Sequence, residues 1–335
     1  MKKHFDLIVC DSCGNKSILA NEQGATCSSC NTTYPMKGNV LIMDEKNKFA
    51  TQVHEVEANN HEVIEEYEKN TWETGKSISS FLKYHCATYT HLHPRWLSPY
   101  LNGSIVGDIG CGQIIYIRQF LPEQVKAYYG IDLGINSLCK ADENIPKDIT
   151  VNLIQHDIDK LPLPSGSMDI VISCEVLEHL NDPIGHLKEL NRICKPGGYL
   201  SISTPCVSEY FYPYEILSVL GKFKQWRKKL SVHEHWEEGV RTWHPGLRPK
   251  ILQNWLNQNN FSVIHHPIAL WYFWTPIKLL IRVVLLLEKL GMPKVGNYFA
   301  EHVRFVEKML EQEIPGFSWF GIRQFVLAKK IGPFE

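Results

Sequence analysis

The stretch VGDIGCGQ, residues 106–113, decides the fold because it turns an apolar run into a glycine-rich loop. The run at residues 104–110 is typical of a buried β-strand, and the small residues that follow let a backbone approach a ligand closely. A dinucleotide-binding fingerprint needs a further glycine at position 115, where this chain has Ile115. The stretch therefore predicts a ligand-binding turn between a strand and a helix, and it disfavours NAD.

Similar apolar runs alternate with helical patterns along the rest of the chain. They predict strands at residues 104–110, 127–134, 150–158, 168–175, 198–205, 261–269 and 322–331. Short strands that alternate with helices are typical of a parallel sheet with helices on both faces. The sequence therefore predicts an α/β fold with seven strands, whose ligands bind at the carboxyl ends of the strands.

One helix is well marked between the fourth and fifth of these strands. Asp182 is a candidate N-cap, Pro183 suits the first turn, and the Pro-Gly-Gly at residues 196–198 is expected to end the helix. The residues expected to share its apolar face are Ile184, Leu187, Leu190 and Ile193.

Acidic residues end the second and third predicted strands. A carboxylate at Asp132 can accept both hydroxyls of a ribose, and Asp157 can accept from an adenine amino group. Each aspartate alone is also compatible with a capping or solvated turn residue. Together with the glycine loop, they predict one adenosyl-sized cleft around Gly110, Gly112, Asp132 and Asp157.

These motifs, in this order, resemble the class I S-adenosylmethionine-dependent methyltransferases. VGDIGCGQ is similar to their glycine-rich first motif, GIDLG (130–134) to their ribose motif, residues 156–180 to their adenine and fourth motifs, and KPGGYLSISTP (195–205) to the following turn and strand. The resemblance implies a seven-stranded Rossmann-like methyltransferase sheet that binds S-adenosylmethionine. The cofactor contacts that it implies come from Asp108, Gly110, Cys111, Gly112, Asp132, Leu133, Asp157, Ile158 and Cys174. This chain departs from many members at Ile114, where they have glycine.

The segment EVLEH, residues 175–179, follows the fourth strand, beside the expected position of the methyl group. His179 could act as a general base toward an alcohol. In the ubiquinone-biosynthesis O-methyltransferases, a similar segment binds a divalent cation, which implies Mg²⁺ or Mn²⁺ at Glu175, Glu178 and His179. The alternative is that these side chains cap and pack the local structure.

Two cysteine pairs stand near the N-terminus, Cys10 with Cys13 and Cys27 with Cys30. Two C-x-x-C knuckles at this spacing predict a structural Zn²⁺ site with four thiolate ligands, and two unrelated redox pairs are the alternative. Gly14 and Gly24 stand where the knuckles and the hairpin between them need permissive backbone. A short strand after a glycine turn is expected within residues 34–43. This region resembles the zinc ribbons that are fused to, or act with, several methyltransferases.

The 335 residues are 44% hydrophobic with a net charge of −1, which excludes a disordered chain and any global attraction to nucleic acid. The other cysteines stand singly, as expected of reduced thiols. Without a long apolar run at the N-terminus, we expect a cytoplasmic protein. The predicted organisation is a zinc ribbon at 1–45, a linker with helices at 46–100, and a methyltransferase domain at 101–335, with substrate-roofing insertions at about 206–260 and 267–320.

The two insertions are expected to choose the acceptor. Residues 222–229 are basic with interleaved aromatics, which is typical of a solvated helix face or of contact with anions. Residues 268–287 are strongly apolar but contain Pro276, Lys278 and Arg282, so we expect a lid, a dimer contact or a peripheral membrane contact rather than a span. The expected acceptor is a hydroxyl of a sugar, a lipid-linked or another small molecule. An RNA methyltransferase, and a non-catalytic ribbon adaptor with a degenerate cofactor site, are the alternatives.

Overall fold

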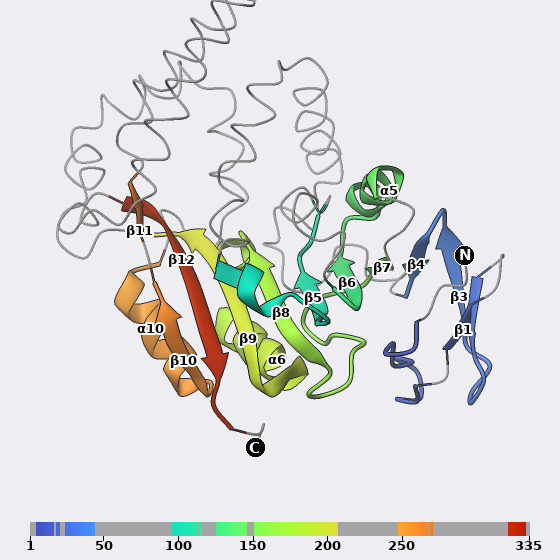
Figure 1. Ribbon diagram of the computed structural model, residues 1–335. Helices are drawn as coiled ribbons and strands as arrows, with labels where there is room; N and C mark the ends of the chain where they lie inside the picture. The colour runs from blue at the N-terminus through green and yellow to red at the C-terminus, as the bar shows by residue number, and fades with distance from the viewer. Residues whose placement is uncertain are drawn as a thin grey trace, which may run out of the picture.

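The computed structural model describes residues 5–16, 18–20, 24–43, 96–112, 114, 125–145, 151–206, 247–266, 268–270 and 321–332. These residues form a mixed sheet in the order β1-β2-β3-β4-β7-β6-β5-β8-β9-β12-β10, with β11 paired to β12 (Figure 1). Most of the predicted linker and most of each predicted insertion lie outside the described residues, as do all of residues 222–229, whereas residues 247–260 of the first insertion are described. Of the apolar stretch 268–287, only residues 268–270 are described.

The centre of the sheet is parallel. It consists of β5 (Ile105–Ile109), β6 (Ala127–Asp132), β7 (Val151–Gln155), β8 (Met168–Cys174) and β9 (Cys194–Pro205). β6 and β7 lie on one side of β5, and β8 and β9 lie on the other. The chain therefore reverses its direction of travel across the sheet at β5, which is where open α/β sheets bind ligands. The predicted Rossmann-like α/β fold is confirmed.

Antiparallel strands complete one side of the sheet. β12 (Gly321–Lys330) pairs with β9, and both β10 (Phe261–His265) and β11 (Ile268–Leu270) pair with β12. The prediction of a single strand over residues 261–269 was therefore wrong, because the chain divides this segment between two strands that pair with different parts of β12.

The N-terminal residues add four more strands at the other side. These are β1 (Ile18–Ala20), β2 (Gly24–Cys27), β3 (Thr33–Lys37) and β4 (Val40–Ile42), of which β4 pairs with β7 in parallel. The short strand predicted after a glycine turn within residues 34–43 is confirmed as β4, because Gly38, with φ +60°, makes the turn that precedes it, whereas β3 before that turn was not predicted. With these strands and β11, the described sheet has twelve strands rather than seven.

The described helical segments are the 3-10 helices η1 (Ser98–Tyr100) and η2 (Leu177–His179), and the α-helices α5 (Ile135–Asn144), α6 (Pro183–Ile193) and α10 (Pro249–Gln258). The helix marked in the sequence is α6, and its predicted cap is confirmed because the Asp182 carboxylate accepts from the Gly185 N–H at 2.8 Å. Ile184 is 37% exposed, so its predicted place on the apolar face was wrong. The helix also ends before residues 196–198, because β9 begins at Cys194.

Helices cover both faces of the sheet, as predicted. Leu187 of α6 and Leu256 of α10 belong to the apolar cluster on one face, and Leu138 of α5 and Leu101, next to η1, belong to the cluster on the other. Within the described residues, no helix is both long and apolar enough to cross a bilayer.

Candidate cofactor and metal sites

The loop after β5 has the backbone that its glycines predict. Gly110 and Gly112 have φ values of +73° and +50°, which glycine adopts without steric cost. The N–H groups of Gly110 and Cys111 donate to the Ile131 carbonyl at 2.8 and 3.2 Å, which fixes the loop against the end of β6. A Cβ at Gly110 would lie 2.4 Å from Val176, whereas a Cβ at Gly112 would meet nothing within 4 Å. Glycine is therefore needed at 110 for packing, and Gly112 borders open space.

Ile114, in the loop after β5, has a backbone conformation that glycine adopts more easily than isoleucine. Its φ is +55°, a left-handed conformation that a β-branched residue rarely adopts, and its N–H donates to the Cys111 carbonyl at 2.9 Å. The side chain is 3% exposed and packs in the cluster that contains Leu138 and Tyr128. Burial of this side chain offsets a backbone cost of about 1–3 kcal/mol. The loop therefore has a left-handed residue at position 114 although that residue is not glycine.

Asp132 lies directly beside the glycine loop. Its two carboxylate oxygens accept from the Gly112 N–H at 2.8 Å and from the Gly134 N–H at 2.7 Å. The first bond ties the end of β6 to the loop after β5, and the second caps the turn that leads into α5. The structure thus brings together two of the residues that the sequence predicted to share one site.

The end of β7 joins the same group through its backbone. The His156 N–H donates to the Asp132 carbonyl at 3.1 Å, and the Gln155 side chain donates to the Leu133 carbonyl at 3.3 Å. β7 ends at Gln155, so the prediction that Asp157 ends this strand was wrong by two residues. Asp157 instead begins a turn, and its carboxylate accepts from the Asp159 N–H at 3.0 Å. Ile158 is half-buried against the apolar core.

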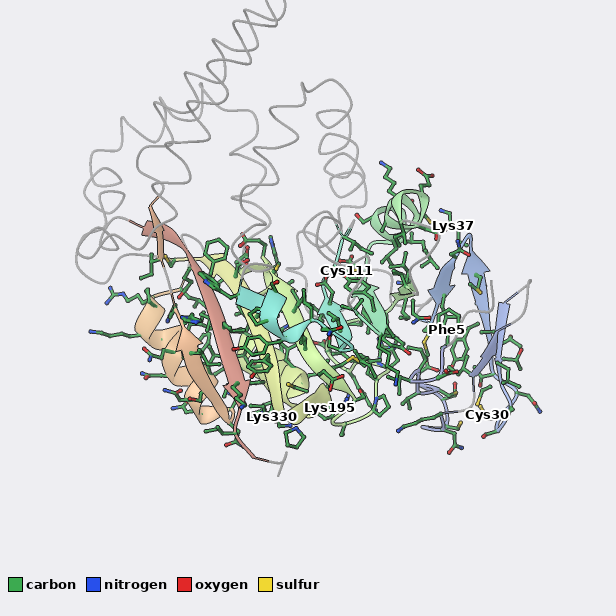
Figure 2. The ribbon with its side chains drawn as sticks, in the orientation of Figure 1. Phe5, Cys30, Lys37, Cys111, Lys195 and Lys330 are labelled. Atoms are coloured by element: carbon green, nitrogen blue, oxygen red, sulfur yellow. The ribbon has the colours of Figure 1, made fainter. Side chains whose placement is uncertain are left out.

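Three other predicted cofactor residues are buried behind the loop. Asp108 is 3% exposed, and the Tyr128 hydroxyl donates to its carboxylate. Burial raises the pKa of Asp108 to about 7, with the Tyr128 hydrogen bond acting in the opposite direction. Burial likewise raises the pKa of the Cys111 and Cys174 thiols well above their usual value, so both are protonated and unreactive near neutral pH. Figure 2 labels Cys111 at the end of β5.

The loop after β8 is attached to β9 by side-chain hydrogen bonds. The Ser203 hydroxyl donates to the Glu175 carboxylate at 2.8 Å, and the Thr204 hydroxyl donates to the Glu178 carboxylate at 3.0 Å. The Glu175 N–H also donates to the Ser203 carbonyl at 2.9 Å, and Glu175 has the unusual φ of +56°. Non-glycine residues with such backbone are often found at functional sites.

His179, at the end of this segment, is partly exposed. Its side chain is 32% exposed, whereas the neighbouring Glu178 side chain is 1% exposed, and Nε2 of His179 lies 3.9 Å from Oε1 of Glu178. Among the described residues, the one group of three or more potential metal ligands is formed by cysteines. The two glutamates bind β9 hydroxyls, so the structure does not support Mg²⁺ or Mn²⁺ there.

The four N-terminal cysteines form that group. Their sulfur atoms all lie within 4.8 Å of one another, and the Cys10–Cys30 and Cys13–Cys27 sulfur pairs are each 3.6 Å apart. A tetrahedral zinc ion with Zn–S bonds of about 2.3 Å requires sulfur separations of about 3.8 Å. The residues present therefore fit a structural zinc ion.

The two knuckles have matching backbones. The Gly14 N–H donates to the Cys10 carbonyl, and the Asn31 N–H donates to the Cys27 carbonyl, both at 2.8 Å. Gly14 and Asn31 have φ values of +74° and +61°, so the predicted need for permissive backbone is confirmed at Gly14. Gly24 has a different role, because a Cβ there would lie 2.8 Å from the Tyr34 carbonyl across the hairpin.

Several residues at these sites were missed in the sequence. Ser203 and Thr204 hold the loop after β8, Val176 fills the space beside Gly110, and Tyr128 binds Asp108. The pair of hydroxyl residues at the carboxyl end of a predicted strand was a usable signal. No sequence signal indicated the contacts of Val176 and Tyr128, because these contacts depend on how neighbouring strands align.

Residues 107–202 match the family described as a methyltransferase domain, which is less than a third of the chain. An uncharacterized methyltransferase of Schizosaccharomyces pombe is 32% identical over 126 residues, covering 33% of this chain and 45% of that protein. A mitochondrial ubiquinone biosynthesis O-methyltransferase of Dictyostelium discoideum is 26% identical over 174 residues, which cover 49% of this chain and 51% of that protein. A tRNA U34 carboxymethyltransferase of Hydrogenovibrio crunogenus is 30% identical over 127 residues, which cover 34% of this chain and 38% of that protein.

The chain spans about half, or less, of the length of these relatives. The matched segment begins in β5 and ends in β9, so it includes the glycine loop, Asp132 and the loop after β8. The centre of the sheet is therefore the part of the chain that is similar to the methyltransferase-domain family.

Proposed function

We propose that this protein is an S-adenosylmethionine-dependent methyltransferase that methylates a hydroxyl of a sugar, a lipid-linked or another small molecule. The observation that carries the proposal is the hydrogen bond from the Gly112 N–H to the Asp132 carboxylate, which joins two cofactor motifs at one edge of the sheet. The methyltransferase-domain match over the same residues supports it independently.

The chain's own residues would bind the cofactor by shape and by charge. Gly112, which borders open space, would let the loop backbone come close to the methionine portion, while Gly110 lets the loop pack against Val176. The Asp132 carboxylate would accept from ribose hydroxyls. Asp157 and Ile158 follow β7 and would contact the adenine. When bound, the cofactor supplies an electrophilic methyl group. The four cysteines would hold a structural zinc ion in the ribbon.

His179 is the proposed general base. An alcohol must lose its proton as it attacks a methyl group, and a half-exposed imidazole can take that proton at a ring nitrogen. The buried carboxylate of Glu178 lies 3.9 Å from Nε2 of His179. In this proposal Glu175 and Glu178 position the loop through their bonds to β9, and His179 would face the acceptor.

The acceptor class rests on composition and on the relatives. A net charge of −1 gives little long-range attraction to RNA, and one relative is named as an O-methyltransferase of ubiquinone biosynthesis. A small or lipid-linked acceptor in the cytoplasm, with peripheral membrane contact through residues 268–287, is consistent with both.

The test is to incubate the purified protein with cofactor carrying a labelled methyl group and with fractionated cell extract. Label in the small-molecule, glycan or lipid fraction is expected. Label in RNA would replace the acceptor class proposed here, and label in no fraction would contradict methyltransferase activity.

The role of His179 is tested on the labelled fraction. His179→Ala should lower turnover about tenfold or more without changing cofactor affinity, because it removes only proton transfer. Lys188→Ala, at an exposed position on α6, is the matched control. Unchanged turnover of His179→Ala would remove His179 from the mechanism.

A further inference from the structure

The N-terminal ribbon, residues 5–43, makes a backbone hydrogen bond near each end of the segment 155–162. The Met43 N–H donates to the Gln155 carbonyl at 3.1 Å, and the Val9 N–H donates to the Pro162 carbonyl at 2.9 Å. Asp157 and Ile158, the proposed adenine contacts, lie between these two anchors. Val9 directly precedes the metal-ligand candidate Cys10, so one of the anchors is part of a knuckle.

The ribbon also completes the sheet beside this segment. β4 pairs in parallel with β7, with Leu41 opposite Ile154. Val40 and Leu41 are both 0% exposed, and they belong to the apolar clusters on opposite faces of the sheet. β4 is thus buried on both faces, as interior strands of parallel sheets are. Without it, β7 would be an edge strand with its apolar side chains uncovered.

A third contact reaches the helix that follows Asp132. The Asn39 N–H, in the turn between β3 and β4, donates to the Asp142 carboxylate of α5 at 3.0 Å. Figure 2 shows Lys37, beside this turn, close to α5, whereas Cys30 lies at the far end of the ribbon. Phe5, which is 2% exposed, packs in the core cluster shared by the ribbon and the sheet.

We infer that the ribbon is a positioning element for the adenine side of the cofactor site, so that metal occupancy of the four cysteines and cofactor binding are thermodynamically linked. This inference rests on the proposed function. A ribbon of this size buries too little apolar surface to fold firmly alone, and its metal supplies much of its folding free energy. Loss of the metal would release the Val9 and Met43 anchors and let the segment that carries Asp157 move. By linkage, bound cofactor must then strengthen metal binding by the same factor.

The decisive experiment uses the intact wild-type protein. The affinity for zinc is measured by competition with a chromogenic chelator, with and without saturating S-adenosylhomocysteine, the demethylated cofactor. We expect zinc affinity about tenfold higher with the nucleoside bound, within the usual range of coupling between sites. Equal zinc affinities, in protein that calorimetry shows to bind the nucleoside, would overturn the inference and leave the proposed function intact. Failure of the zinc-loaded protein to bind the nucleoside would contradict the proposed function itself.

A pair of variants tests the anchor without removing the metal. Val9→Pro deletes the N–H that donates to Pro162, whereas Val9→Ala keeps it and shortens only the side chain. With zinc bound in both, Val9→Pro should bind S-adenosylhomocysteine about tenfold more weakly than Val9→Ala. Equal affinities would overturn the role of this anchor. The chelator competition remains decisive if Val9→Pro does not fold, because that measurement needs no variant.

Discussion

The two sides of the sheet hold their strand-end loops by different means. Beside β5 and β6, backbone N–H groups of Gly112 and Gly134 donate to one carboxylate, that of Asp132. Beside β8 and β9, side-chain hydroxyls of Ser203 and Thr204 donate to two carboxylates. The first arrangement needs glycine and one acid at fixed places, whereas the second needs matched pairs of side chains.

The difference fits the proposed roles of the two sides, cofactor binding beside β5 and β6 and acceptor binding beside β8 and β9. The backbone arrangement leaves Gly112 beside open space, which suits a cofactor that many acceptors share. The side-chain arrangement on the β8 side fixes the loop that carries His179, and such pairs can change with the acceptor. The ribbon adds to the contrast, because β4 pairs with β7, on the side where the cofactor site is proposed.

The largest expected effect follows from the position of the ribbon. Cys27→Ser should remove a buried metal ligand and unfold the ribbon, since structural zinc contributes on the order of 10 kcal/mol to the folding of small metal-binding peptides. Hydrogen exchange should then quicken in β7 more than in β9, because β4 covers only β7. Cys139→Ser, on α5 outside the cysteine group, is the control. An equal loss of protection in β7 and β9 would contradict the contrast between the two sides.

A smaller effect concerns the buried carboxyl of Asp108. Burial raises its pKa from 3.8 to about 7, so the folded protein binds this proton more tightly than the unfolded chain does. The free energy of unfolding should therefore fall as pH rises from about 4 to about 7, by about 1.4 kcal/mol for each unit of difference between the two pKa values. Asp108→Asn cannot titrate, so denaturant unfolding should show less pH dependence in the variant. Identical pH dependence would show that this carboxyl does not titrate as described.

The smallest effect is on the β8 side. Thr204→Val removes the hydroxyl that donates to the buried Glu178 carboxylate and should lower the free energy of unfolding by about 1–3 kcal/mol. Thr204→Ser keeps the hydroxyl and should cost less. Urea unfolding of both variants is the measurement. If valine and serine proved equivalent, the hydrogen bond would not be what holds this loop.

The sequence predicted the features that depend on local patterns of residues. The central strands, the α6 cap and the cysteine group follow from local patterns, namely apolar runs, an N-cap aspartate and C-x-x-C spacing, whereas the reversal at β5 was not predicted. Gly112 and Asp132 were expected to meet because parallel strands bring their carboxyl ends to one edge.

The rest depended on contacts between distant segments. Nothing in the sequence indicates that Val40 and Leu41 pair with β7, because a three-residue strand has no distinctive pattern. The EVLEH segment suggested metal ligands, yet Ser203 and Thr204, far along the chain, accommodate its carboxylates. Ile114 suggested a degenerate loop, while its burial against Leu138 accounts for its backbone.

The most direct measurement is calorimetric titration of the zinc-loaded protein with S-adenosylhomocysteine, compared with Asp132→Asn. The account predicts that the wild type binds and that Asp132→Asn binds about 10 to 100 times more weakly, since a hydrogen bond to a charged group contributes about 1.5–3 kcal/mol. Glu143→Gln, at an exposed position on α5, should bind like the wild type. Absence of binding by the wild-type protein at millimolar concentration, or equal binding by Asp132→Asn, would contradict a cofactor site at this edge of the sheet.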